Sequence, residues 1–219
     1  MQPEEGSGHA VAKCGLRHKH VLSASSDSAV FYLVHGRAGT VDVMWTFRRV
    51  IPEHAHIIAV EAPIPDPLGG FSWWLADDPE WRNVATDSLN MLVHFIEEAE
   101  ALYGIRPRYR VALGFSQGGG LLSLLLEKGD PPLSALGLLA SFVIEGHKYS
   151  GPHPPVFIAH GTQDEAVRIE RARAGAAFLR SQGFAVTMVE DAVGHKVGSS
   201  AMRLLKGWLA DPNNAIALR

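Results

Sequence analysis

Three side chains that could together break an ester bond occur along the chain in the order serine, acid, histidine. Ser116 stands in the segment GFSQGGG, Asp164 in HGTQDEAV and His195 in DAVGHKVG. A serine hydroxyl is a weak nucleophile until an adjacent imidazole takes its proton, and a carboxylate can hold that imidazole in the correct tautomer. These residue types predict nucleophilic catalysis with Ser116 as nucleophile, His195 as base and Asp164 as the partner of the base.

The glycines around Ser116 indicate a sharp turn from a strand into a helix. Residues 114–118, GFSQG, match the G-x-S-x-G pattern of a nucleophile elbow. The N-terminus of the helix that follows would point at the reacting centre, so the main-chain N–H of Gln117 is one expected oxyanion donor. The main-chain N–H of Arg37, directly after Gly36, is the other expected donor. A serine that merely caps a helix is the plainer alternative, and the ordered acid and histidine disfavour it.

Other glycine-rich sites are excluded by their patterns. A phosphate-binding P-loop would need G-x-x-x-x-G-K-[ST], and a dinucleotide site would need G-x-G-x-x-G. Neither pattern occurs in the chain.

The elements that must carry these residues alternate between strand and helix. Apolar runs typical of buried strands are predicted at 29–36, 56–63, 109–116, 133–141, 154–161 and 184–191. Helical spacing is predicted at 41–51, from a cap at Asp78 to Gly104, and at 117–129, 165–183 and 199–210. The fold class is therefore α/β, with a mostly parallel central sheet and helices on both faces. Ligands bind such sheets beyond the carboxyl ends of the strands, where the three reactive residues fall.

Length and composition predict one domain over residues 1–219, with an N-terminal tail at 1–14 and a C-terminal tail at 211–219. The 20 Lys and Arg against 23 Asp and Glu give a charge of −3, so no basic field favours nucleic acid. A single cysteine, Cys14, excludes an internal disulfide and favours a reducing compartment, the cytoplasm. The chain has no apolar run of about 18 residues, so stable membrane insertion is not expected. Whether two chains form a homodimer stays open.

At this point four segments together resemble a known family. VHGRAGTVDVM, GFSQGG, HGTQDEAV and GHKVGSSAMRLLKGWL look like the phospholipase/carboxylesterase branch of the α/β-hydrolases, which includes acyl-protein thioesterases and bacterial carboxylesterases. The resemblance runs from about Val30 to Leu209. It implies the α/β-hydrolase fold with little or no cap domain and hydrolysis of esters or thioesters without metal or organic cofactor. It also implies a triad of Ser116, Asp164 and His195, with Arg37 and Gln117 as oxyanion donors.

The chain departs from the family pattern beside the base. The family commonly has an acidic residue after the histidine, whereas Lys196 follows His195 here. This change bears on substrate preference more than on the chemistry.

Several other residues carry both a functional and a structural interpretation. Phe71, Trp73 and Trp74, in GGFSWWLADDPEW, either line an acyl pocket or cover the edge of the core. The segment RHKH at 17–20 is interpreted as a solvated surface strand rather than a metal site. His35 and His160, which each precede a glycine at a strand end, are interpreted through the resemblance as residues that support turns.

These observations predict a serine hydrolase that cleaves small carboxylic esters of short to medium acyl chain through an acyl-enzyme. An acyl-protein thioesterase or lysophospholipase acting on long chains is the alternative within the same chemistry. A ligand-binding protein on a hydrolase scaffold is the alternative that is not an enzyme.

Overall fold

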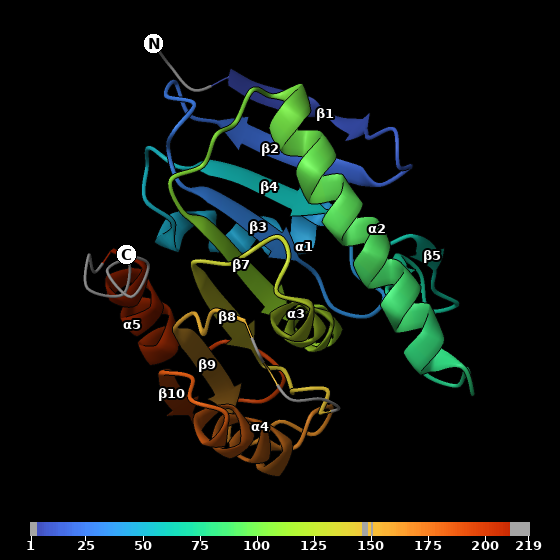
Figure 1. Ribbon diagram of the computed structural model, residues 1–219. Coiled ribbons are helices and arrows are strands. Elements are labelled where there is room, and N and C mark those ends of the chain that lie inside the picture. Colours follow the sequence, from blue (N-terminus) through green and yellow to red (C-terminus); the bar gives the residue numbers. More distant parts are fainter. Residues whose placement is uncertain (1–3, 146–148, 150, 211–219) are drawn as a thin grey trace.

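A sheet of eight strands forms the centre of the protein (Figure 1). The computed structural model describes residues 4–145, 149 and 151–210. The strand order across the sheet is β1-β2-β4-β3-β7-β8-β9-β10. The strands are β1 (Glu4–Val11), β2 (Arg17–Leu22), β3 (Val30–Val34), β4 (His56–Val60), β7 (Arg110–Phe115), β8 (Ala135–Leu139), β9 (Val156–Gly161) and β10 (Val186–Asp191). All neighbours from β4 to β10 pair in parallel, whereas β1 and β2 are antiparallel. The predicted mostly parallel sheet is confirmed.

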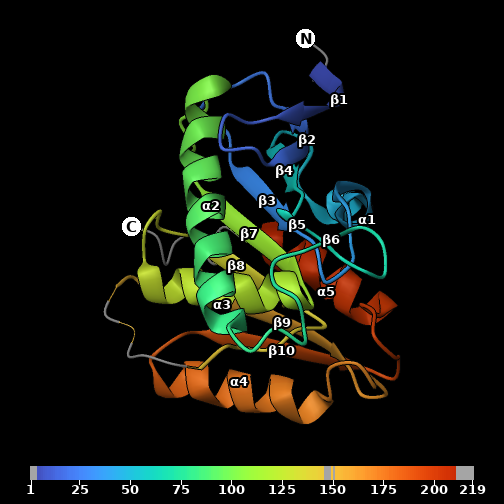
Figure 2. The ribbon, with the colours of Figure 1, turned by 90° about the vertical axis from the view of Figure 1, so that its right-hand side faces the viewer.

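Helices cover both faces of this sheet (Figure 2). One face packs against α2 (Trp81–Leu102), α3 (Gln117–Lys128) and α4 (Ile169–Ser181). The other packs against α1 (Val41–Trp45), the 3₁₀ helix η1 (Thr46–Val50) and α5 (Ser199–Ala210). The sheet therefore separates two apolar cores, as predicted from the alternation of strands and helices.

Strand β3 shows how the sequence supplies both cores at once. Its five residues are all buried. Val30, Tyr32 and Val34 face the core beneath α2, α3 and α4, and Phe31 and Leu33 face the opposite core. Successive side chains of a strand point to opposite faces, so a continuous apolar run is what a strand covered on both sides requires.

Two predicted helices differ at their ends. The segment 41–51 is not one α-helix, because it tightens into η1 after Trp45. Helix α2 begins at Trp81 rather than just after Asp78. The Asp78 carboxylate still accepts the N–H of Glu80 at 2.8 Å, so it organises the turn before the helix without capping the helix itself.

The prediction of an N-terminal tail at 1–14 is wrong for most of that segment. Residues Glu4–Val11 form β1 and pair antiparallel with β2, with Glu4 opposite Leu22 and Val11 opposite Arg17. Main-chain hydrogen bonds to an open strand edge do not need an apolar side-chain pattern, which is why the polar sequence of this segment did not reveal the strand. The predicted tail at 211–219 lies outside the described residues.

The segment 17–20 is also less solvated than expected. It lies in β2, which is flanked by β1 and β4, and the ring of His18 is only 1% exposed. His18 Nε2 lies 2.7 Å from the hydroxyl of Tyr103, and its ring contacts Phe95 edge-on. Burial is the main cause that lowers the pKa of His18. Across the described ranges, no group of three or more His, Cys, Asp or Glu is placed to hold a metal ion.

The carboxyl ends of the parallel strands meet at one edge of the sheet. Val34 of β3 lies opposite Gly114 of β7, and Asp191 of β10 lies opposite Gly161 of β9. The turns that follow these strands therefore share this edge. Among the helices of the described residues, none combines the length and the hydropathy that a bilayer crossing needs.

Candidate active site

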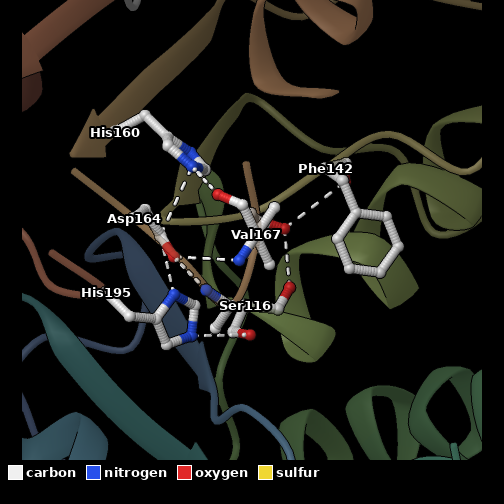
Figure 3. A network of polar contacts seen from close by, with 8 residues as sticks. Ser116, Phe142, His160, Asp164, Val167 and His195 are labelled. Atoms are coloured by element: carbon white, nitrogen blue, oxygen red, sulfur yellow. Dashed lines mark hydrogen bonds and ion pairs between the residues drawn. The ribbon is translucent and has the colours of Figure 1, made fainter. Parts of the chain in front are cut away.

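The three residues of the predicted triad lie together at the carboxyl edge of the sheet (Figure 3). Ser116 follows β7, Asp164 follows β9 and His195 follows β10. His195 Nε2 is 3.0 Å from Ser116 Oγ, and His195 Nδ1 is 2.7 Å from Asp164 Oδ2. In this geometry Nδ1–H donates to the carboxylate, which leaves Nε2 free to accept the serine proton.

Ser116 occupies a strained turn between β7 and α3. Its backbone has φ 49° and ψ −117°, a positive φ that side-chain-bearing residues rarely adopt. A Cβ at Gly118 would lie 2.4 Å from the carbonyl oxygens of Val34 and His35, and one at Gly114 would lie 2.6 Å from Gly119 Cα. Only glycine fits at either place, which explains the G-x-S-x-G spacing.

The N–H and the carbonyl of Ser116 are both bonded to residues at and just after the end of β8. The N–H of Ser116 donates to Leu139 O at 2.9 Å, and the buried hydroxyl of Ser141 donates to Ser116 O at 2.6 Å. Figure 3 shows Ser116 within this network. Sequence reasoning missed Ser141. Its signal was a serine at the end of the predicted strand 133–141, next to the strand that carries Ser116.

The carboxylate of Asp164 is buried and fully oriented by its loop. Oδ1 accepts the main-chain N–H groups of Ala166 and Val167, each at 2.9 Å. Oδ2 is thereby directed at His195, whose side chain is 29% exposed while that of Asp164 is 0% exposed. The acid is sealed inside the protein and the base opens to solvent, where a substrate can reach it.

A second imidazole contacts the same acid. His160, at the end of β9, donates from Nε2 to Val167 O at 2.7 Å, and this nitrogen is 3.4 Å from Asp164 Oδ2 (Figure 3). Its Nδ1 is buried and has no hydrogen-bond partner in the part of the chain that the structure describes. His160 closes the loop of residues 160–167, here called the acid loop, and does not contact Ser116.

His195 also packs against an aromatic ring. Its ring centroid lies 5.0 Å from that of Phe115, the residue before the nucleophile. The next residue, Lys196, has an exposed side chain, and its N–H donates to Gly194 O at 2.7 Å.

The segment with the first predicted oxyanion donor, residues 35–39, is here called the oxyanion loop. His35 at its start is fully buried; its Nε2 accepts the N–H of Ala62 at 2.9 Å, and its Nδ1 lies 2.7 Å from Gly36 O. Since a carbonyl only accepts, Nδ1 carries the proton and the ring is neutral. Burial lowers the pKa of His35 to about 4. The ring therefore supports the turn, as interpreted from the sequence.

The second predicted donor belongs to a residue whose side chain has a structural task. Gln117 begins α3 and is 5% exposed. Its Oε1 accepts the N–H of Trp73 at 2.9 Å, and its Nε2 donates to Trp74 O at 2.7 Å. The side-chain amide of Gln117 is engaged in these two bonds. The group of Gln117 predicted to face a substrate is its main-chain N–H.

The three aromatic residues suggested for the substrate pocket differ in exposure. Trp73 is 0% exposed, and its indole N–H donates to His35 O at 2.9 Å. Trp74 is 6% exposed and stacks at 5.7 Å on Trp81. Phe71 is half-buried. The contacts of the two tryptophans fit the core-covering alternative, while Phe71 keeps a face toward solvent.

Two sizeable cavities lie away from the triad. One of about 680 Å³ lies between η1 and the end of α5, and another of about 420 Å³ lies between α2 and α3. Neither is lined by Ser116, Asp164 or His195. We therefore assign the chemistry to the open edge of the sheet and not to these cavities, because the reacting atoms are at that edge.

Comparison with known proteins places this geometry in a family. Residues 52–204 match the model of the family described as "Serine hydrolase (FSH1)", a range that includes all three triad residues. A probable carboxylesterase of Oryza sativa subsp. japonica is 30% identical over 124 residues, which are 53% of this chain and 47% of that protein. This chain thus spans about half the length of the curated relative it matches.

Solved structures show the same fold. The carboxylesterase of Bacillus cereus aligns with a TM-score of 0.81 and 20% identity over 89% of this chain and 93% of that one. A carboxylesterase of Mesorhizobium loti aligns with a TM-score of 0.78 and 21% identity over 97% of this chain and 100% of that one. These likenesses confirm the predicted α/β-hydrolase fold, and the family match covers well over half of the residues: the chain belongs to the serine hydrolase (FSH1) family.

Proposed function

We propose that this protein hydrolyses small carboxylic esters of short to medium acyl chain, with Ser116, His195 and Asp164 as its catalytic triad. The observation that carries the proposal is the continuous chain of contacts, 3.0 Å from Ser116 Oγ to His195 and 2.7 Å from His195 to Asp164. Membership of a serine hydrolase family supports the same chemistry.

In the acylation half of the proposed reaction, Ser116 Oγ attacks the ester carbonyl while His195 Nε2 takes the hydroxyl proton. The tetrahedral oxyanion accepts hydrogen bonds from the main-chain N–H groups of Arg37 and Gln117. His195 then returns the proton to the departing alkoxide, and the acyl group stays on Ser116. Asp164 stabilises the imidazolium throughout and keeps the ring in its Nδ1–H tautomer.

Deacylation repeats these steps with water in place of the alcohol. His195 takes a proton from the water, the hydroxide attacks the acyl-enzyme, and the same two N–H groups hold the second oxyanion. Ser116 recovers its proton from His195 and the carboxylic acid leaves. Nucleophile, base and oxyanion donors all come from the chain, so the proposed steps need no metal or organic cofactor.

The preference for short chains is supported by the residues next to Ser116. Trp73 and Trp74, whose main chains bond to the side chain of Gln117, are buried, and among the described residues the cavities of about 680 and 420 Å³ are not lined by the serine. A long acyl chain would need an apolar tunnel beside the nucleophile. Thioesters react by the same steps, since a thiolate leaves more readily than an alkoxide.

Hydrolysis of p-nitrophenyl acetate, butyrate, octanoate and palmitate, with Ser116→Ala as control, tests the proposal. We expect rates that are highest for the short esters and lost in the variant. Highest rates on palmitate would move the assignment to a lysophospholipase or acyl-protein thioesterase. Hydrolysis that survives in Ser116→Ala, or no hydrolysis together with no labelling of Ser116 by a fluorophosphonate, would favour a binding protein on this scaffold.

A further inference from the structure

Residues 66–74, here called the brace loop, contact both segments that carry the proposed oxyanion donors. The brace loop includes the short strand β6 (Phe71–Ser72), which pairs with β5 (Ile64–Pro65). The three aromatic residues suggested as a substrate pocket belong to it. Its polar contacts point to a different task.

On one side, a buried carboxylate of the brace loop holds the oxyanion loop. Asp66 has a side chain of 0% exposure, and its Oδ2 accepts Arg37 Nε at 3.1 Å and Ser72 Oγ at 2.7 Å. Its Oδ1 accepts the N–H of Leu68 at 2.9 Å, so both oxygens are satisfied. A buried charge with this many partners is expensive to disturb, which makes Asp66 a firm anchor.

The same anchor reaches the main chain beside Arg37. Ser72 Oγ, which donates to Asp66, accepts the N–H of Ala38 at 3.0 Å. Gly39 and Phe71 exchange main-chain hydrogen bonds in both directions, at 3.1 and 2.9 Å. The N–H groups of the two residues after Arg37 are thus taken by the brace loop, which leaves the N–H of Arg37 for the substrate. Ala38 has φ 54°, a strained conformation that these bonds stabilise.

On the other side, the brace loop holds the start of α3. The side chain of Gln117 spans the main chain of Trp73 and Trp74, as described above. The Trp73 carbonyl also accepts Ser88 Oγ of α2 at 2.6 Å, so the brace loop is itself tied to a long helix. One short segment therefore binds the residue that carries the second donor as well.

We infer that the brace loop sets the distance between the N–H groups of Arg37 and Gln117, with Asp66 and Ser72 as positioning residues of the oxyanion hole. This inference rests on the proposed function. An oxyanion exists only in the transition state and the tetrahedral intermediate, so misplacing a donor lowers kcat and leaves the binding of the substrate nearly unchanged.

The test compares four variants with the wild type. Ser72→Ala removes the acceptor of Ala38 N–H and one donor to Asp66, whereas Ser72→Thr keeps the hydroxyl. Asp66→Asn keeps the shape of the side chain but removes the charge that holds Arg37. Asp27→Asn is the matched control, because Asp27 also accepts a serine hydroxyl, that of Ser25, and interacts with an arginine, Arg108, but lies before β3 at the opposite edge of the sheet.

Four quantities are measured for each protein: kcat and KM for p-nitrophenyl acetate, the inhibition constant of a trifluoromethyl ketone, and the fraction of Ser116 that a fluorophosphonate titrates. The ketone forms a tetrahedral adduct whose oxyanion needs both donors. We expect Ser72→Ala and Asp66→Asn to lower kcat per titrated site about 10- to 100-fold, with KM within about twofold. The inhibition constant should rise by the same factor, while Ser72→Thr, which keeps the hydroxyl, recovers part of the loss and Asp27→Asn stays near the wild type.

Unchanged ketone inhibition in both variants, a change in KM alone, or a loss that only follows the titrated fraction would overturn the inference while leaving the proposed function intact. A wild type without hydrolysis dependent on Ser116 would instead overturn the proposed function, and the role of the brace loop with it.

Discussion

The oxyanion loop and the acid loop begin with the same dipeptide, His-Gly, at the ends of two parallel strands, yet their histidines are bonded differently. His35 has partners on both ring nitrogens, Ala62 N–H and Gly36 O. Within the described residues, His160 has partners only on Nε2, which faces both Val167 O and Asp164. Both rings are buried.

This difference separates a purely structural histidine from one that contacts the triad. The bonds of His35 end on Gly36 O, within the turn, and on Ala62 N–H, after β4, and they need a neutral ring. Those of His160 end on Val167 O and on Asp164, the residue that would orient the proposed catalytic base. The dipeptide alone does not distinguish these situations, because the hydrogen-bond partners of the two rings come from other parts of the chain.

The largest expected effect concerns the acid loop. Asp164→Asn would present an N–H where His195 needs an acceptor, which favours the wrong imidazole tautomer. We expect kcat to fall about 10⁴-fold with the fold intact. Steady-state kinetics on p-nitrophenyl acetate check this, with the exposed neighbour Glu165→Gln as control. A loss below tenfold would show that Asp164 does not serve the base.

The next effect concerns the oxyanion loop and is one of stability. The pKa of His35 is lowered to about 4 in the folded protein, against 6.5 in the unfolded chain. The unfolded state therefore binds more protons as the pH falls below 6.5, so folding stability is lost on acidification. The loss should reach about 3 kcal/mol near pH 4, because each pH unit across this window is worth about 1.4 kcal/mol.

Urea unfolding of the wild type and of His35→Gln, at pH 7 and at several lower values, measures this contribution as the difference between the two curves. NMR of the His35 ring gives an independent readout, since the neutral Nδ1–H form should persist to about pH 4. A ring that titrates near pH 6.5 would contradict the bonding described for this turn.

The smallest expected effect returns to the acid loop. His160→Leu removes the donor to Val167 O and loosens the loop that aims Asp164 at His195. We expect kcat to fall by up to about 10²-fold, with KM little changed. His160→Gln can still donate to that carbonyl and should recover part of the loss. Equal activity of both variants and the wild type would make His160 as structural as His35.

Much of the fold and the core of the site could be predicted from the sequence. Apolar runs such as that of β3 gave the parallel sheet, because a strand covered on both faces must be apolar throughout. The triad could be proposed from the sequence because Ser116 lies between glycines and because Asp164 and His195 follow predicted strands in the expected chain order; the family resemblance implied the same three residues.

What could not be predicted depends on contacts between distant segments. Strand β1 is held by main-chain bonds that leave no pattern in the sequence. Asp66, Ser72 and Ser141 are ordinary polar residues until the fold brings them beside Arg37 and Ser116. His18 was expected on the surface because its neighbours are basic, whereas β2 lies between β1 and β4 and the ring of His18 packs against Phe95 and Tyr103.

At Ser116, the residue type that would be most stable differs from the one that the proposed reaction needs. A positive φ costs a side-chain-bearing residue about 1 to 3 kcal/mol, and glycine adopts it freely. Ser116→Gly would thus be inactive and more stable, and thermal unfolding of that variant measures the difference.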